Sequence, residues 1–167
     1  VIVRGVLINL GFYALYSGGY DFPVEIWTLT VFVILFSAGI AWFKDIPDIE
    51  GDAQEAIGSL AIEKGAGKAF SAGVWLLGLA YSSAALAPLF FDFQMGSGSI
   101  ITIGHAILGI AFLSLASKTN PLEKKQMKRF YLSFWVLFSW NMCFGSLGFS
   151  LFLYPLLRPN TQAKTPI

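Results

Sequence analysis

The chain has 167 residues, of which 56% are hydrophobic and only 13% are charged, and its formal net charge is +1. Charged residues are about half as frequent as in an ordinary soluble domain, and a soluble domain of this length could not bury so much apolar surface. The composition therefore favours a bilayer as the solvent, and the small net charge excludes a general attraction to nucleic acid.

The chain begins with Val1 inside an apolar run, VIVRGVLINLGFYALY, which lacks the layout of a signal peptide. We therefore expect it to be part of a longer protein. Five apolar segments follow, each near the ~20 residues that cross a hydrocarbon core, and inside lipid such segments must be helices. They cover residues 1–16, 26–43, 69–91, 100–116 and 130–157. The sequence predicts an all-α, multi-span transmembrane bundle over residues 1–157 and a polar tail over residues 158–167.

The charges of the connecting loops predict the orientation of the bundle. Nine of the eleven Lys and Arg residues fall on one side of the predicted membrane. They are Arg4, Lys44, Lys64, Lys68, Lys118, Lys124, Lys125, Lys128 and Arg129. By the positive-inside rule, the loop over residues 44–67 lies on the cytoplasmic side or on its stromal equivalent.

That loop opens with the stretch WFKDIPDIEGDAQEA, which holds three aspartates and two glutamates. Asp45, Asp48 and Asp52 are spaced i, i+3 and i+7, which places side chains on one face of a helix. Pro47 predicts that the membrane helix ends near Asp45 and that a new helical turn begins near Pro47. Three carboxylates on one face repel one another, so the spacing favours a cation between them.

Oxygen ligands of this kind suit Mg²⁺, which takes a few carboxylates, retained waters and phosphate oxygens. An EF-hand calcium loop does not fit the spacing. A start at Asp45 puts Pro47 and Ile49 in ligand positions. A start at Asp48 puts Ala53 where that loop needs glycine.

Three lysines lie in the same loop, at Lys44, Lys64 and Lys68. Acids that hold a metal beside bases that hold an anion predict a metal–diphosphate site. The alternative interpretation is that the charges only solvate a loop at the membrane surface.

The stretch KDIPDIEGD, followed by GSLAIEKGAGKAF, resembles the second aspartate-rich motif and following helix of the UbiA superfamily of membrane prenyltransferases. VRGVLINLGFY and FYLSFWVLF resemble its homogentisate prenyltransferase branch, which serves tocopherol and plastoquinone synthesis. The resemblance implies a ring of nine transmembrane helices around a lipid-open cavity. The five segments then correspond to helices five to nine. It also implies Mg²⁺ as cofactor, and a prenyl diphosphate and an aromatic acceptor as substrates.

The resemblance also assigns residues. Asp48 and Asp52 match the metal-binding aspartates of the second motif, and Asp45 matches the acid just before them. We therefore expect Asp45, Asp48 and Asp52 to bind the metal. Lys44, beside the diphosphate, is expected to act with Asp48 and Asp52 in catalysis.

Further contacts with the diphosphate or the cavity are predicted at Arg4, Asn9, Lys64 and Lys68. Snorkelling of Arg4 to the interface is an alternative reading of that residue. Aromatic residues near the predicted cavity are expected to stabilise the developing allylic cation by cation–π contact. These aromatic residues are Phe12, Tyr13, Trp42 and Phe43.

The chain departs from the family pattern in two places. Glu63 stands where the family often carries a basic residue, although Lys64 follows at once. The first aspartate motif, NxxxDxxxD, is absent, because only Asp21 precedes Asp45. We therefore expect an N-terminal half to complete the metal site, and we expect the present chain alone to be inactive.

Other residues are interpreted structurally. His105 and Asn141 are expected to form hydrogen bonds between packed membrane helices, and Cys143 to be a small buried apolar residue that forms no internal disulfide. The basic run KTNPLEKKQMKR, residues 118–129, is expected to be a cytoplasmic loop near anionic headgroups.

The sequence thus predicts the C-terminal part of an integral membrane enzyme that transfers a prenyl group to an aromatic acceptor, most simply homogentisate. It would lie in a bacterial inner, thylakoid or plastid membrane. Three alternatives remain open: another aromatic or tetrapyrrole acceptor, a cation-binding membrane protein, and a non-catalytic remnant. A transport site is the less favoured reading, because such sites lie in the middle of a span.

Overall fold

The computed structural model describes residues 2–49, 58–93 and 97–157, with side chains at all of these positions except 2, 4, 97 and 142–157. The regular elements of these residues are helices, and no strand occurs among them. The helices are α1 (Ile2–Ser17), α2 (Val24–Asp45), α4 (Leu60–Lys64), α5 (Ala66–Phe90), α6 (Ser97–Ser117) and α7 (Lys124–Leu157). The predicted all-α bundle is confirmed.

Three helices are long and apolar enough to cross a membrane: α2, α5 and the part of α6 from Gly98 to Ser117. The apolar part of α1, Gly5–Ser17, is shorter than a full span. Helix α7 has 34 residues, which at the rise of an α-helix is about 50 Å and exceeds the hydrocarbon core. The chain is therefore an integral membrane protein.

One predicted boundary is wrong. The run over residues 118–129 was expected to be a loop, but α7 already begins at Lys124. The reason is the burial of Met127, which anchors the first turns of α7 in the core together with Phe130. The polar tail predicted over residues 158–167 lies outside the described residues.

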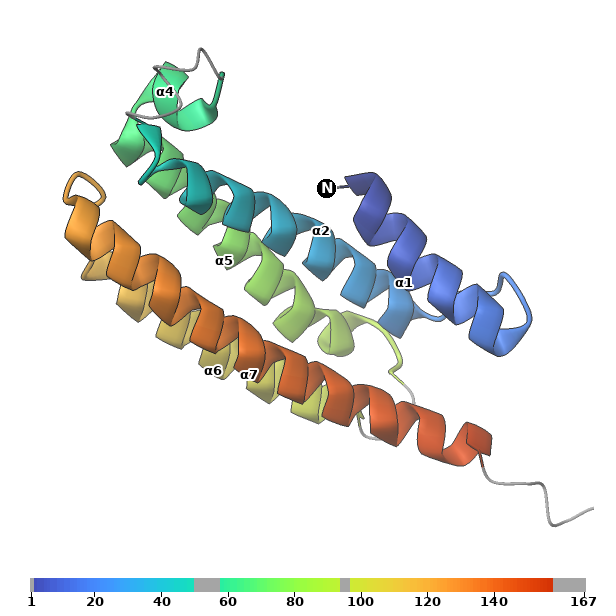
Figure 1. Cartoon of the computed structure of the whole chain (residues 1–167). Helices are drawn as coiled ribbons and strands as arrows, with labels where there is room; N and C mark the ends of the chain where they lie inside the picture. The colour runs from blue at the N-terminus through green and yellow to red at the C-terminus, as the bar shows by residue number, and fades with distance from the viewer. Residues whose placement is uncertain (1, 50–57, 94–96, 158–167) are drawn as a thin grey trace, which may run out of the picture.

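The long helices run side by side, and α1 packs on the outer side of α2 (Figure 1). Successive helices run in opposite directions, so their ends collect at two poles. One pole holds the end of α2, helix α4, the start of α5 and the α6–α7 turn (Figure 1). We call it the charged pole, because Lys44, Asp45 and Lys68 lie there.

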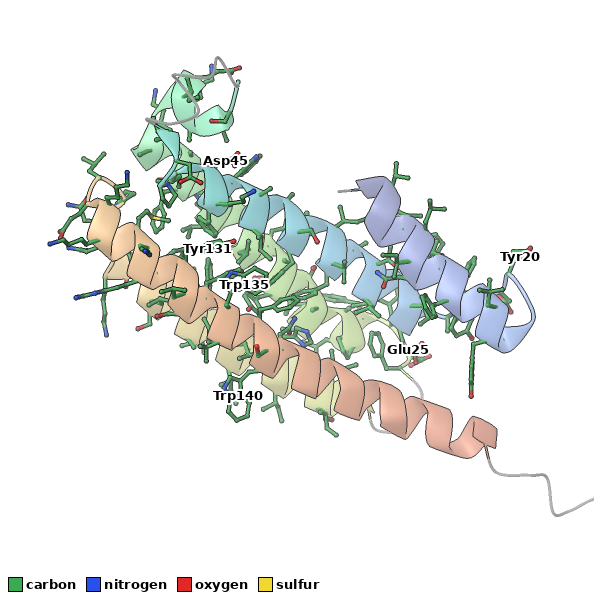
Figure 2. All side chains as sticks on the ribbon, in the orientation of Figure 1. Tyr20, Glu25, Asp45, Tyr131, Trp135 and Trp140 are labelled. Carbon is green, nitrogen blue, oxygen red and sulfur yellow. The ribbon has the colours of Figure 1, made fainter. Side chains whose placement is uncertain are left out.

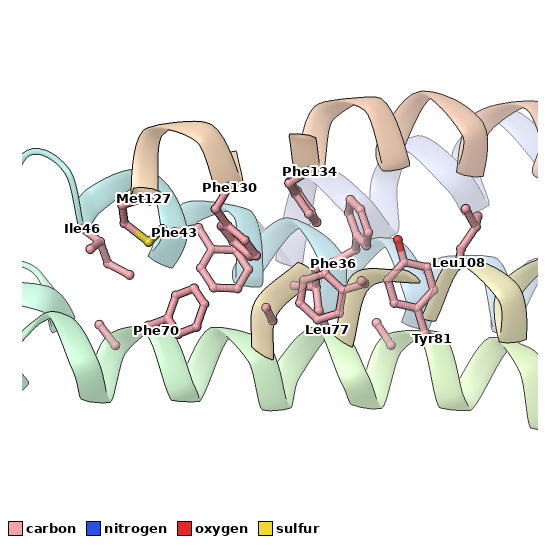
Figure 3. Close-up of a cluster of buried hydrophobic side chains, with 14 of the residues drawn as sticks. Phe36, Phe43, Ile46, Phe70, Leu77, Tyr81, Leu108, Met127, Phe130 and Phe134 are labelled. Atoms are coloured by element: carbon pink, nitrogen blue, oxygen red, sulfur yellow. The ribbon is translucent and has the colours of Figure 1, made fainter. Parts of the chain in front are cut away.

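The core is built from aromatic rings contributed by all four long helices (Figure 3). Phe36 of α2 stacks on Phe134 of α7 with ring centroids 5.2 Å apart. Nearer the charged pole, the ring of Phe43 packs edge-on against the ring of Phe130, with centroids 5.0 Å apart. Large rings thus bridge α2 and α7, whereas small residues bring α2 and α5 close together.

The closest approach of α2 and α5 occurs at Gly39 and Gly73. A Cβ added at Gly39 would overlap Leu77, and its next neighbours would include the carbonyl oxygen of Gly73 at 3.6 Å. A Cβ added at Gly73 would lie 2.7 Å from Cε1 of Phe43. The two helices therefore touch at a distance that only glycine permits, a common way for membrane helices to pack.

The buried polar residues differ from expectation. His105 is buried and its ring packs edge-on against Phe32, but Nδ1 is hydrogen-bonded at 2.8 Å to the carbonyl oxygen of Ile101 in its own helix. Asn141 is buried too, yet among the described residues nothing donates to its Oδ1. The hydrogen bond of His105 therefore stays within α6, and the rings of Phe32 and Tyr81 lie across from it.

The contact between α2 and α5 gives a first prediction. Gly73→Ala should destabilise the full-length protein by about 1–3 kcal/mol, because the ring of Phe43 is held by four neighbouring phenylalanines and cannot yield. Gly78→Ala in the same helix is the control, since a Cβ there meets no atom within 4 Å. Thermal unfolding in detergent should separate the two variants, and equal midpoints would contradict the proposed close contact.

Candidate functional site

The end of α2 alternates between buried and exposed positions. Phe43 and Ile46 are buried in the core, whereas Lys44 is exposed and Asp45 is half-buried. Asp45 is the last helical residue, and its carboxylate is labelled in Figure 2 at the charged pole. The two buried side chains therefore fix the direction in which the chain leaves the bundle.

The chain turns at Pro47 and Asp48, and Ile49 is helical again. Proline has no N–H to continue the hydrogen-bond ladder of α2, which accounts for the end of the helix. Asp48 is exposed, and Ile49 is partly buried against the core. The predicted end of the helix near Asp45 and the new turn near Pro47 are confirmed.

The continuous three-aspartate helix face is not seen. The turn at 46–48 separates Asp45 from Asp48, so these two residues do not share one uninterrupted helix. Asp52 lies outside the described residues, and no group of three metal-binding side chains occurs within the part of the chain that is described. Binding of a metal by Asp45, Asp48 and Asp52 stays a prediction.

The chain returns to the bundle through α4, a short helix within the stretch GSLAIEKGAGKAF, which the resemblance assigns to the helix after the aspartate motif. Ser59 caps it, with its Oγ accepting a hydrogen bond from the Ile62 N–H at 3.3 Å, and Ala61 is buried against the core. A serine before LAIEK and a glycine after it are the usual signals of such a helix. Gly65 joins α4 to α5 with φ of +84°, a conformation that L residues rarely adopt.

This return places two lysines at the charged pole. Lys64 ends α4 and Lys68 lies in the first turn of α5, and both are exposed. Helix α4 packs on both α2 and α5. The fold therefore brings Lys44, Asp45 and Asp48 to the same end of the bundle as Lys64 and Lys68 (Figure 1).

The two predicted α1 residues lie elsewhere. A Cβ at Gly5 would lie 3.2 Å from Cγ1 of Ile34, so α1 contacts α2 near that level. Ile34 precedes Asp45 by eleven residues, or about 16 Å along the helix. Arg4 precedes Gly5 and so lies at about the level of Ile34, and its side chain is outside the described residues. Asn9 lies one helical turn beyond Gly5, farther from the charged pole. Their contact with a cavity stays a prediction.

The side-chain amide of Asn9 is suited to a polar contact with a part of the protein beyond the described residues. Its side chain is half-buried, and no described residue accepts a hydrogen bond from its buried Nδ2. An unsatisfied amide inside a membrane is costly, so a partner from elsewhere in the protein, or a ligand, would stabilise it.

The four residues predicted to make cation–π contacts differ in their burial. Phe43 is fully buried among other phenylalanines and serves as a core residue, which is a correction. Phe12 is exposed on α1, and Tyr13 packs against Phe22 beside the α1–α2 turn. Trp42 is half-buried near the charged pole.

A hollow of about 380 Å³ lies at the opposite pole, between the end of α5 and the start of α6. It is lined by Pro88, Phe91, Asp92 and Thr102, among others, and touches none of the predicted site residues. The hollow is therefore unconnected with the charged pole.

Comparison with known proteins decides the family. The chain matches the UbiA prenyltransferase family over residues 1–142. The chain belongs to this family. It is 34% identical over 141 residues to a homogentisate phytyltransferase of Synechocystis, a match that covers 81% of the chain and 45% of that protein.

Two further family members extend the comparison. A chloroplastic homogentisate solanesyltransferase of Arabidopsis thaliana is 32% identical over 93% of the chain and 39% of its own length. A chloroplastic naringenin 8-dimethylallyltransferase of Sophora flavescens is 32% identical over 73% of the chain and 30% of its own length. The chain thus spans less than half the length of these relatives, and no solved structure matches it.

Proposed function

We propose that this chain is the C-terminal part of a membrane prenyltransferase that joins a prenyl group from a prenyl diphosphate to homogentisate. The observation that carries the proposal is the charged pole, where carboxylates and lysines sit at the end of a membrane bundle. The resemblance of the chain to a homogentisate phytyltransferase and a homogentisate solanesyltransferase supports the choice of acceptor.

The charged pole suits the recognition of a diphosphate. Lys44, Lys64 and Lys68 present three cationic groups that neutralise the phosphate oxygens. The carboxylates of Asp45 and Asp48 are hard oxygen donors and fit a divalent cation, on which members of this family generally depend. We propose Mg²⁺ as that cation, with Asp52 as a third ligand. When bound, it would neutralise charge on the leaving diphosphate.

The role of the charged pole in the reaction follows from the negative charge that grows on the leaving diphosphate. The allylic C–O bond breaks, and the diphosphate leaves with the electron pair while the lysines neutralise its growing charge. An aromatic carbon of the acceptor forms a bond to the allylic carbon, and the ring loses a proton. The prenyl chain lies in the apolar region, because only the diphosphate end is charged.

The first test of the proposed site removes the carboxylate of Asp48. Asp48→Asn in the full-length protein should lower Mg²⁺-dependent prenyl transfer by about 100-fold or more, since it removes a charged ligand without changing the shape of the side chain. Asp48 is exposed, so folding should be unaffected. Asp21→Asn, an exposed aspartate in the turn between α1 and α2, is the control. Chelation of the divalent metal should abolish prenyl transfer, and added Mg²⁺ should restore it. Unchanged prenyl transfer by the Asp48→Asn variant would disprove the site.

The acceptor needs a separate measurement. Membranes that contain the full-length protein should transfer a labelled prenyl group to homogentisate faster than to naringenin, 4-hydroxybenzoate, a naphthoate or a chlorophyllide. A higher kcat/KM for any other acceptor would replace homogentisate and leave the charged pole as the diphosphate site.

We propose that the charged pole faces the cytoplasm or the stroma, because the Lys and Arg residues collect there. A membrane-impermeant thiol reagent should label Glu63→Cys, in α4, from that side and Tyr20→Cys from the other, in a Cys143→Ser background. Both positions are exposed, so the reagent will reach them. Labelling of both from one side would refute the topology.

A further inference from the structure

The α6–α7 turn carries a second cluster of positive charge, distinct from the lysines of the aspartate loop. Five cationic residues lie between positions 118 and 129, and all five side chains are exposed. They are Lys118, Lys124, Lys125, Lys128 and Arg129, which we call the basic corner. The one acid in this stretch, Glu123, accepts a hydrogen bond from the Nε2 of Gln126. The corner therefore presents a strong local positive charge.

The corner is held in shape by its own hydrogen bonds. The Asn120 N–H donates to Oε1 of Gln126 at 2.9 Å, and the Leu122 N–H donates to Oδ1 of Asn120 at 3.1 Å. The first turns of α7 are anchored by Met127 and Phe130, which are fully or almost fully buried. Because the backbone is already ordered, a ligand of the corner has only side chains to immobilise.

The outer face of α7 places these cations at the depth of the headgroups. Lys125, Lys128 and Arg129 share a face with Leu132 and Val136, by the i, i+3, i+4 and i+7 spacing of a helix. Leu132 and Val136 are 59% and 57% exposed, so none of the described helices covers this apolar face of α7. Arg129 lies about 5 Å along the axis from Leu132. The cations therefore begin where the apolar face ends.

The turn itself adds an apolar contact. Leu122 is 79% exposed beside the cations, a position that suits insertion among lipid chains at the interface. On α6, Leu113 is exposed and precedes Lys118 by about 8 Å along the helix axis. Both helices of the turn thus change from apolar to cationic at their outer surface near the same level.

The inward face of α7 separates the basic corner from the proposed diphosphate site. Met127 lies beside Ile46 in the core (Figure 3), and Phe130 contacts Phe43 of α2. The side of α7 that meets the end of α2 is therefore apolar. Lys125, Lys128 and Arg129 lie on another face of α7, the one that they share with the exposed Leu132 and Val136.

From these observations we propose that the basic corner is a binding surface for anionic membrane lipids, whose headgroup phosphates or sulfonates lie between the cationic side chains. The long stems of Lys and Arg pack along the apolar surface while their heads reach the anions. Bound lipid would brace the start of α7 against the end of α2 through Phe130 and Phe43. The proposal depends on the membrane position of α7 and not on the reaction catalysed.

The test uses the full-length protein in nanodiscs of phosphatidylcholine, with or without 30 mol% phosphatidylglycerol as a chosen test composition. The variant Lys125→Gln/Lys128→Gln/Arg129→Gln removes three of the five positive charges of the corner. The matched control, Lys125→Arg/Lys128→Arg/Arg129→Lys, keeps it. Thermal midpoints and the phosphatidylglycerol retained, measured by native mass spectrometry, are compared at low and high salt.

We expect phosphatidylglycerol to raise the midpoint of the wild type and of the control, with a smaller rise at high salt. The Gln variant should lose this rise and bind the anionic lipid more weakly, by about fivefold for each cation removed. Its midpoint in pure phosphatidylcholine should equal that of the wild type, since the three positions are exposed.

Two results would overturn the proposal. One is equal retention of phosphatidylglycerol by the Gln variant and the wild type. The other is a raised KM for the prenyl diphosphate in the Gln variant with unchanged lipid retention, which would assign the corner to the substrate. A loss of prenyl transfer in Asp48→Asn with normal lipid retention would keep the two sites separate.

Discussion

The structure depends on the contact between α2 and α5 at Gly39 and Gly73. Without side chains at these positions the helix backbones approach closely, and the ring of Phe43 lies over Gly73. In lipid, apolar burial gives little net drive for helices to associate, so close packing of this kind is a main source of stability. Phe43 in turn holds the last turn of α2 in the core, two residues before the helix ends at Asp45.

Two buried residues anchor the charged loop to the bundle, one before it and one after it. Ile46 is buried just past the end of α2, and Ala61 is buried in α4 on the return. The chain is thus anchored on both sides of the segment that contains Asp48. Charged side chains at the pole point outward, because the positions between them are occupied by apolar residues that pack on α5 and α7.

The charged pole presents two surfaces of different chemistry. The aspartate loop mixes carboxylates with lysines, a combination that suits a metal and a diphosphate together. The basic corner has five cations and one acid, and it continues an exposed apolar face of α7. The buried residues Met127 and Phe130 lie between these surfaces, so the proposed diphosphate site and the proposed lipid site are separate.

The sequence by itself determined that the long apolar segments are helices, because twenty apolar residues in lipid have no alternative to a helix. It also determined the end of α2 at Asp45, where Pro47 interrupts the ladder, and the family, through the resemblance of the stretches KDIPDIEGD and GSLAIEKGAGKAF. Only the tertiary structure decided that Phe43 is a core residue, that α1 contacts α2 about 16 Å from Asp45, and that α7 starts at Lys124. These facts depend on which residues of distant segments pack together, and hydrophobicity along one chain does not specify that pairing.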